Sequence, residues 1–148
     1  MIVLDANILI RVVLGARALD LVNKYASDVQ FLAPILAFQE AERHVPKILA
    51  ERSTSEALFR HRMEEAEAIF SRLRSMIAIV SEDQLLVFKD AANQRLRKRD
   101  PNDWPILAAS LALNCPIWTE DMDFFGTGVP TWTTDRVEIY LQSQAAKE

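Results

Sequence analysis

Five acidic residues occupy positions from which their carboxylates could meet at one end of a folded domain. Asp5 interrupts the apolar stretch MIVLDANILI, where a carboxylate removed from water without a partner would cost several kcal/mol. The other four acids, which lie in or beside apolar segments far apart along the chain, are Glu40, Asp103, Asp121 and Asp123. We therefore expect Asp5 to be capped, paired or bound to a metal ion.

A cluster of such acids would need bound cations. Two carboxylates about 5 Å apart repel each other by about 3 kcal/mol at an effective dielectric constant near 20. Oxygen ligands suit Mg²⁺ and Mn²⁺, which also keep several water molecules. A carboxylate-held ion with open positions lowers the pKa of bound water and stabilises charge on a phosphate. The acids therefore indicate phosphoryl chemistry.

Most of these acids also have purely structural explanations. Asp103 could favour the N-terminus of a helix through its charge. Asp121 and Asp123 could form a turn. Glu40 could be a solvated helix residue, and Glu42 is an alternative second acid on a different face. Asp5, which lies inside the apolar stretch MIVLDANILI, is the hardest of the acids to explain in this way.

Other kinds of site have little support in the sequence. The single cysteine, Cys115, excludes an internal disulfide framework and a multi-cysteine zinc site, and its apolar surroundings predict a buried, inert thiol. His44 and His61 lie in segments predicted as helical surface. Three glycines are too few for a phosphate-binding glycine-rich loop.

Apolar stretches alternate with helical patterns along the chain. Strands are predicted at 1–9, where the strand runs into a turn, and at 29–34, 76–80, 115–119 and 130–134. Helices are predicted at 16–26, 35–49, 53–74, 81–98, 103–114 and 135–144.

Several residues mark the predicted helix boundaries. Pro46 is expected to kink or break its helix. Ser81 and Gln84 have the spacing of a capping box, and Pro105 is tolerated in a first turn.

Strands that are apolar along their length and separated by helices indicate an α/β fold with a parallel sheet covered on both faces. No linker or internal repeat interrupts residues 1–148, so we expect a single domain. Ligands of such folds bind beyond the carboxyl ends of the strands, where Asp5, Asp121 and Asp123 are placed. No apolar run reaches the roughly 18 residues of a membrane span, and no secretory signal is present, so we expect a cytoplasmic protein.

Four segments together resemble the PIN domain family, which includes the VapC toxins of bacterial and archaeal toxin–antitoxin pairs. The segments are MIVLDANILI, APILAFQEAE, DPNDWPILAASLALNCPIWTEDMDFF and PTWTT. The resemblance covers nearly the whole chain. It implies a three-layer α/β/α sandwich with a mainly parallel sheet, and an Mg²⁺- or Mn²⁺-dependent ribonuclease activity.

The resemblance also implies roles for particular residues. The four family acids correspond to Asp5, Glu40, Asp103 and Asp121, which would be the metal ligands. Asp123 would be an additional catalytic residue, as a ligand or by holding a water molecule. Asn7 and Thr119 occupy positions where the family has polar residues that support the site.

The charge of the chain has to be reconciled with RNA binding, because a net charge of −4 disfavours contacts with phosphates. Two divalent cations would offset that charge. The basic run RLRKR at 95–99 leads into the proposed site, and Trp104 beside it could stack on a base or pack in the core. Further arginines mark the long predicted helix, namely Arg60, Arg62, Arg72 and Arg74.

The stretch from Pro46 to Arg74 is longer than a minimal PIN domain needs. Its amphipathic helix could provide a dimer surface, a groove for an antitoxin or a clamp for RNA, although core packing alone would also explain it. We expect a homodimer.

We therefore predict a metal-dependent endoribonuclease, the toxin of a toxin–antitoxin pair, with RNA as substrate and an antitoxin protein as partner. One alternative is a haloacid-dehalogenase-like phosphohydrolase acting on small molecules. That chemistry normally needs a second aspartate where this chain has Asn7. The other alternative is a catalytically idle PIN-like protein-binding module.

Overall fold

A five-stranded parallel sheet forms the centre of the computed structural model, which describes residues 1–97 and 99–147. Its strand order is β3-β2-β1-β4-β5, and every neighbouring pair is parallel. The strands are β1 (Ile2–Leu4), β2 (Phe31–Pro34), β3 (Ile77–Val80), β4 (Ile117–Trp118) and β5 (Thr131–Trp132). The parallel sheet predicted from the apolar stretches is confirmed.

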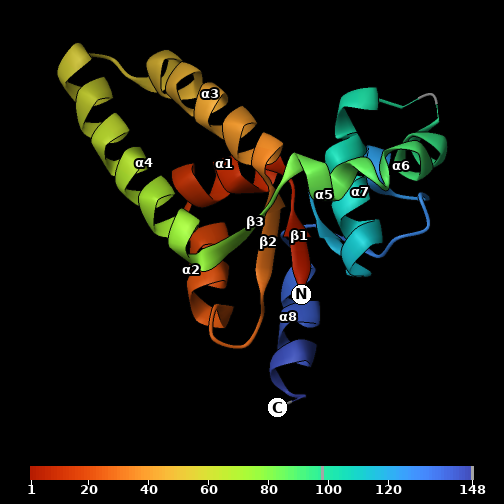
Figure 1. Cartoon of the computed structure of the whole chain (residues 1–148). Helices are drawn as coiled ribbons and strands as arrows, with labels where there is room; N and C mark the ends of the chain where they lie inside the picture. Colours follow the sequence, from red (N-terminus) through yellow and green to blue (C-terminus); the bar gives the residue numbers. More distant parts are fainter. Residues whose placement is uncertain (98, 148) are drawn as a thin grey trace.

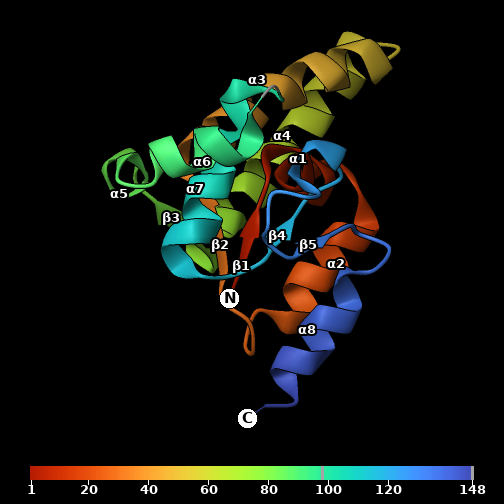
Figure 2. The same ribbon diagram turned by 90° about the vertical axis from the view of Figure 1, so that its right-hand side faces the viewer.

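Helices connect the strands and cover both faces of the sheet, as parallel connections require. Figure 1 shows α1–α4 on one side of the sheet and α5–α7 on the other, and Figure 2 gives the view turned by 90°. The helices are α1 (Ala6–Leu14), α2 (Ala16–Tyr25), α3 (Ile35–Arg52), α4 (Glu56–Met76), α5 (Glu82–Leu86), α6 (Lys89–Leu96), α7 (Trp104–Leu113) and α8 (Val137–Ala145). The short 3₁₀ helices η1 (Pro101–Asp103) and η2 (Met122–Phe124) precede α7 and follow β4. The predicted three-layer α/β/α sandwich is confirmed.

The first strand is shorter than the sequence predicts. Ile2, Val3 and Leu4 are fully buried, but the strand ends there and α1 begins at Ala6. The prediction of a strand through residue 9 is wrong, because Asp5 caps the helix and accepts a hydrogen bond from the Ala6 N–H. The apolar residues that follow belong to the buried face of α1.

Two helix predictions also need correction. Pro46 does not break α3, which is continuous, because Val45 and Leu49 are buried in the core and stabilise the helix on both sides of the proline. The helix predicted for 81–98 is divided into α5 and α6 at Phe88, whose φ of −103° and ψ of 3° are not helical. Its predicted end at Lys98 lies outside the described residues.

Other local predictions agree with the structure. The Ser81 N–H donates to Gln84 Oε1 at 3.0 Å, within the predicted capping box at the start of α5. Pro105 lies in the first turn of α7, where its missing N–H leaves no intrahelical bond unmade. His44 and His61 are exposed. Cys115 is buried, and this burial raises the pKa of its thiol.

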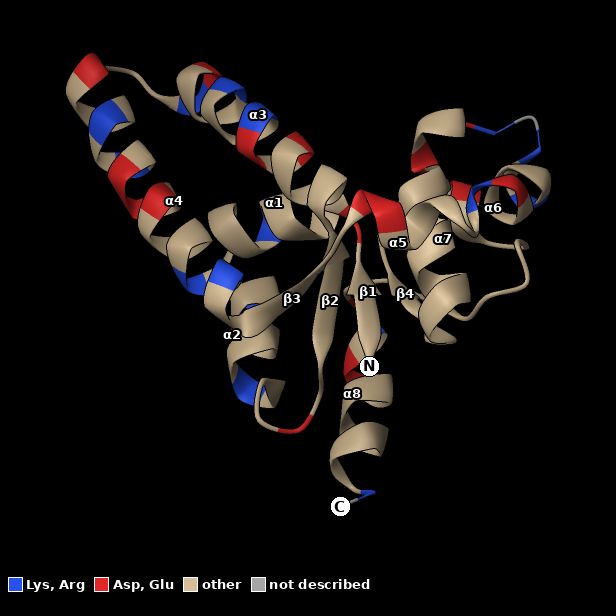
Figure 3. Ribbon diagram, in the orientation of Figure 1, with Lys and Arg blue, Asp and Glu red and all other residues tan. Residues whose placement is uncertain are grey.

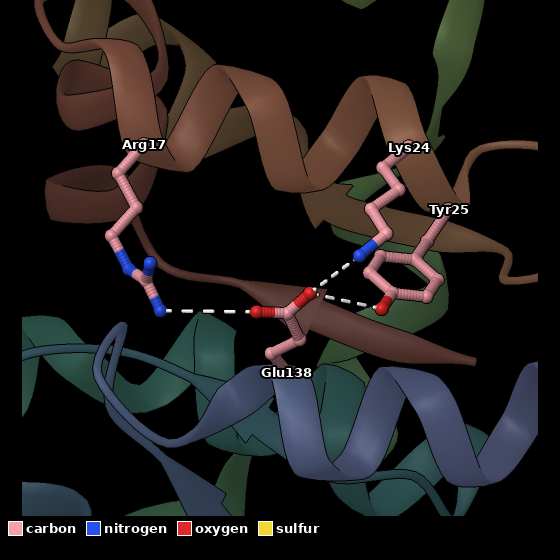
Figure 4. Close-up of polar contacts among 4 residues, drawn as sticks. All are labelled: Arg17, Lys24, Tyr25 and Glu138. Carbon is pink, nitrogen blue, oxygen red and sulfur yellow. Dashed lines mark hydrogen bonds and ion pairs between the residues drawn. The ribbon is translucent and has the colours of Figure 1, made fainter.

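The chain ends in α8, which packs against α2. Glu138 of α8 accepts hydrogen bonds from Lys24 Nζ at 2.8 Å and from Tyr25 Oη at 3.0 Å, as Figure 4 shows. Trp132 and Tyr140 stack nearby with ring centroids 5.8 Å apart. Across residues 1–97 and 99–147, no helix combines the length and the apolar composition that crossing a membrane would require.

Candidate functional site

Asp5 lies at the carboxyl end of β1, the central strand of the sheet, and its side chain is only 8% exposed. Its Oδ1 accepts a hydrogen bond from the Ala6 N–H at 2.6 Å. Its Oδ2 accepts from Thr119 Oγ1 at 2.6 Å and from Asn7 Nδ2 at 2.7 Å. Three donors therefore hold the buried carboxylate in a fixed orientation.

Thr119 and Asn7 connect this carboxylate to the segment that follows β4. Thr119 Oγ1 accepts a hydrogen bond from the Asp121 N–H at 2.9 Å and lies 3.2 Å from Asn7 Nδ2, which donates to it. The Asn7 Oδ1 accepts from the Glu120 N–H at 3.1 Å. The sequence did not reveal the hydrogen bond between Asn7 and Glu120, because only the pairing of β1 with β4 brings these two residues together.

Three further acids form a compact group beside Asp5. One carboxylate oxygen from each of Asp103, Asp121 and Asp123 lies within 4.8 Å of the other two. Asp103 is the last residue of η1 and directly precedes α7, whereas Asp121 and Asp123 belong to the segment around η2. The Asp123 N–H donates to Asp121 Oδ1 at 2.9 Å, which fixes the turn that presents both side chains.

The electrostatics of this group favour a positive partner. Burial and, to a smaller extent, the charges of Asp121, Asp5, Asp100 and Asp123 together raise the pKa of Asp103 to about 7. In addition, Asp103 Oδ2 is buried and has no hydrogen-bond partner within the described part of the chain. A buried carboxylate oxygen without a donor is costly and is readily satisfied by a cation.

Asp5 has a similar but better compensated environment. Its pKa is raised to about 6, chiefly by burial, and the hydrogen bonds from Thr119 and Ala6 partly oppose this rise. The negative charges of Glu40 and Asp121 also raise the pKa of Asp5. Asp121 thus raises the pKa of both Asp5 and Asp103, whereas Glu40 raises only that of Asp5.

Glu40 and Glu42, the two candidates for the second acid, have different surroundings. Glu40 is exposed in the first turns of α3, and it is the glutamate whose charge acts on Asp5. Glu42 forms an ion pair with Arg74 of α4, so its charge is already neutralised. Glu40 nevertheless lies outside the compact group of Asp103, Asp121 and Asp123.

The donor set fits a hard divalent cation. The carboxylates of Asp103, Asp121 and Asp123 converge, and the buried Oδ2 of Asp103 has no hydrogen-bond partner among the described residues. The carboxylate of Asp5 also lies close enough to raise the pKa of Asp103. Oxygen-only ligation of this kind is typical of Mg²⁺ and Mn²⁺. The nearby Glu120 carboxylate is used within the protein, because it accepts hydrogen bonds from the N–H and the hydroxyl of Thr134.

The basic run at 95–99 contacts the loop that carries the acids, and its Lys98 lies outside the described residues. Arg99 Nη1 donates to the Asp123 carbonyl oxygen at 2.6 Å, and Arg95 Nη1 donates to the Thr127 carbonyl oxygen at 3.1 Å. The sequence placed these arginines beside the site but did not reveal that they brace its loop. Trp104 is half-buried against the core, with Lys89 Nζ 4.8 Å from the centre of its ring.

The arginines of α4 are largely used within the protein. Arg60 pairs with Glu56, Arg72 donates to Asn23, and Arg62 Nη1 donates to the Arg52 carbonyl oxygen. Ala66 and Leu73 of the same helix are buried, so α4 contributes to core packing. Figure 3 shows that both acidic and basic residues occur along α4.

The chain was compared with protein-family models and with curated proteins. A family model described as PIN domain matches residues 3–142, which is nearly the whole chain and includes every acid considered above. A search of curated proteins gave no match.

Proposed function

The chain belongs to the PIN domain family, and from this premise we propose that it is a metal-dependent endoribonuclease that hydrolyses RNA phosphodiester bonds. Membership of this family assigns it a nuclease-type function, and the acidic group provides a candidate metal site. The choice of RNA as substrate and the biological role are part of our proposal.

The observation that carries the proposal is the convergence of Asp103, Asp121 and Asp123 with an unsatisfied buried oxygen on Asp103. An assembly of like charges has no benefit for folding, because each carboxylate destabilises the ionised form of the others. It becomes favourable when a divalent cation is bound. Asp5, Glu40, Asp103 and Asp121 would hold one or two Mg²⁺ or Mn²⁺ ions.

Such an ion, when bound, activates water and stabilises the charge that develops on the phosphate. The residues of the chain orient the reactants. Thr119 and Asn7 hold the Asp5 carboxylate in a fixed orientation by donating to Oδ2, and the Thr119 hydrogen bond also favours its ionised form. The Asp123 N–H donates to Asp121 Oδ1, which supports a role in which the Asp123 carboxylate would orient the attacking water or accept its proton.

We further propose that the chain is the toxin of a toxin–antitoxin pair. Its partner would be an antitoxin protein, and its active form would be a homodimer. Residues 1–148 would act as a single domain in the cytoplasm. The PIN family supports the nuclease part of this assignment. A neighbouring gene for a small DNA-binding protein would support the toxin part.

The two alternatives are less well supported. A haloacid-dehalogenase-like mechanism requires an acid at position 7, but Asn7 is a neutral amide that donates to Asp5 and accepts from Glu120. A purely protein-binding module would have no use for the raised pKa values of Asp5 and Asp103.

Cleavage of a structured RNA tests the proposal. Wild-type protein, Asp5→Asn and Asp28→Asn are purified identically and assayed with Mn²⁺ and with EDTA. Asp28 is exposed in the loop before β2, at the amino ends of the strands and therefore away from Asp5, so its variant is the matched control. We expect metal-dependent cutting by wild type and Asp28→Asn, and loss of cutting in Asp5→Asn. Equal cutting by all three would indicate a contaminating nuclease or a site elsewhere, and would refute the proposal.

A further inference from the structure

A groove opens beside Asn7 and leads away from the acidic group. Its volume is about 570 Å³, within the range of pockets that hold small ligands. Three arginines line it, namely Arg11 of α1, Arg17 of α2 and Arg52 at the end of α3. Among the described residues that line the groove, none is acidic. This concentration of positive charge contrasts with the net charge of −4 of the chain.

The guanidinium groups of Arg11 and Arg52 make no hydrogen bond or ion pair within residues 1–97 and 99–147. Arg17 lies 3.9 Å from Glu138, as Figure 4 shows, but its side chain is 60% exposed and solvent weakens this pair. The other carboxylate oxygen of Glu138 already accepts from Lys24 and Tyr25. The arginines of the groove are thus available to an anion from outside the chain.

Apolar side chains form the remaining wall of the groove. Leu14 of α1 and Ile48 of α3 are half-buried and face this space. A second hollow of about 600 Å³ shares Leu14 and Arg52 with the first, and α4 lines it with both Arg62 and the acidic Glu65. The groove beside Asn7, whose described lining holds three arginines and no acid, is therefore the more positive of the two hollows, and Figure 3 shows both basic and acidic residues along the neighbouring α3 and α4.

We propose that this groove binds a single strand of the RNA substrate on one side of the cleaved phosphate. Arg11 and Arg52 contact successive phosphates, and an unpaired base packs against Leu14 and Ile48. Guanidinium groups recognise phosphate through paired hydrogen bonds, and bases expose their faces to apolar side chains only when they are unpaired. This inference rests on the proposed ribonuclease function.

The basic run beyond the other end of the acidic group is less suited to this role. Arg95 and Arg99 donate to carbonyl oxygens of the loop that carries Asp123, so part of their hydrogen-bonding capacity is already used. The free guanidinium groups and the apolar wall occur together in the groove beside Asn7.

Binding of RNA without turnover tests the inference. Each variant is made in an Asp5→Asn background, and the binding of a fluorescent single-stranded RNA is measured by anisotropy at several salt concentrations. Arg11→Gln and Arg52→Gln are compared with Arg60→Gln, whose arginine lies on the exposed surface of α4 and pairs with Glu56. Circular dichroism of each variant verifies that it is folded.

We expect Arg11→Gln and Arg52→Gln each to weaken binding about tenfold at low salt, and to reduce the slope of log affinity against log salt by about 0.7. Arg60→Gln should bind as the background does. An RNA duplex of the same sequence should bind more weakly than the single strand, because its bases are not available to Leu14 and Ile48.

Unchanged affinity in folded Arg11→Gln and Arg52→Gln would overturn the inference, while the proposed nuclease function would still stand on metal-dependent cleavage by wild type. Absence of cleavage by wild type would refute the proposed function independently. Unchanged RNA affinity combined with weaker binding of a partner protein would show that the groove is a protein-binding surface. Equal binding of duplex and single strand would refute the contact with an unpaired base.

Discussion

The hydroxyl of Thr119 donates to Oδ2 of Asp5 at 2.6 Å, although the two residues are 114 positions apart in the sequence. The pairing of β1 with β4 produces this contact, because Leu4 and Trp118, which precede the two residues, are partners in the sheet. The same hydroxyl oxygen accepts from the Asp121 N–H at 2.9 Å. One threonine therefore orients both the first acid of the site and the segment that presents the others.

Replacing Thr119 by valine should impair both the site and the fold. The substitution keeps the shape of the side chain but removes the donor to Asp5, so the pKa of Asp5 should rise further above about 6. We expect the free energy of unfolding to fall by about 1–2 kcal/mol, because a buried carboxylate loses a hydrogen bond. The cleavage rate should fall by about 10- to 100-fold, as found when partners of metal ligands are removed.

Chemical denaturation and a pH–rate profile measure these two effects. Thr131→Val is the matched control, because the Thr131 hydroxyl bonds only to the nearby carbonyl of Val129 in the described structure. Wild-type activity and an unchanged pH profile in Thr119→Val would mean that the hydroxyl does not orient Asp5.

The sequence predicted the parallel sheet and the acids at its carboxyl edge, because strand burial and helical periodicity are local properties of the chain. It failed where two local preferences compete. Ala6–Leu14 is apolar enough for a strand, but the capping bond from Asp5 starts a helix. Pro46 has a poor helix propensity, yet burial of its neighbours keeps α3 continuous.

Details of the candidate site depend on packing between distant elements and were beyond prediction. The sequence could not reveal that Asn7 bridges Asp5 and Glu120, or that Arg99 braces the loop at Asp123, because both contacts join segments on different elements. The choice between Glu40 and Glu42 depends on where α4 places Arg74. The sequence thus indicated which acids could form the site, but it could not indicate the residues with which they form hydrogen bonds and ion pairs.

Binding of a divalent cation should stabilise the protein. Mn²⁺ bound only by the folded state adds about 2.7 kcal/mol to the free energy of unfolding at a concentration one hundred times the dissociation constant. We expect a rise in Tm with Mn²⁺ for wild type and for the exposed-site control Asp28→Asn. Asp121→Asn should show little or no rise. A Tm of wild type that does not respond to Mn²⁺ or Mg²⁺ would argue against a metal centre.

In EDTA, stability should decrease as the pH rises from about 4 to about 7. Folded Asp103 keeps its proton up to a pKa of about 7, whereas the unfolded chain loses that proton near pH 3.8. Within this interval the folded state binds more protons, so each increase in pH favours unfolding. Asp5, with a pKa of about 6, contributes in the same direction between about pH 4 and 6.

Denaturation of wild type and Asp103→Asn at a series of pH values isolates this contribution. We expect the variant to be more stable than wild type by about 1 kcal/mol at pH 8, after allowance for solvent screening at a half-buried group, and similar to it at pH 4. A difference that is independent of pH would show that Asp103 titrates normally in the folded protein.

Glu40 and Glu42 should respond in opposite ways to the same substitution. Glu42→Gln removes the ion-pair partner of Arg74, and we expect a loss of about 0.5–1 kcal/mol in the free energy of unfolding with little change in cleavage. Glu40→Gln removes an exposed charge that raises the pKa of Asp5, so the metal-free protein should be as stable as wild type or slightly more stable. Its cleavage rate should nevertheless fall at least tenfold if Glu40 is the metal ligand that we propose. Parallel denaturation and cleavage assays of the two variants decide the assignment, and a reversed pattern would make Glu42 the second acid of the site.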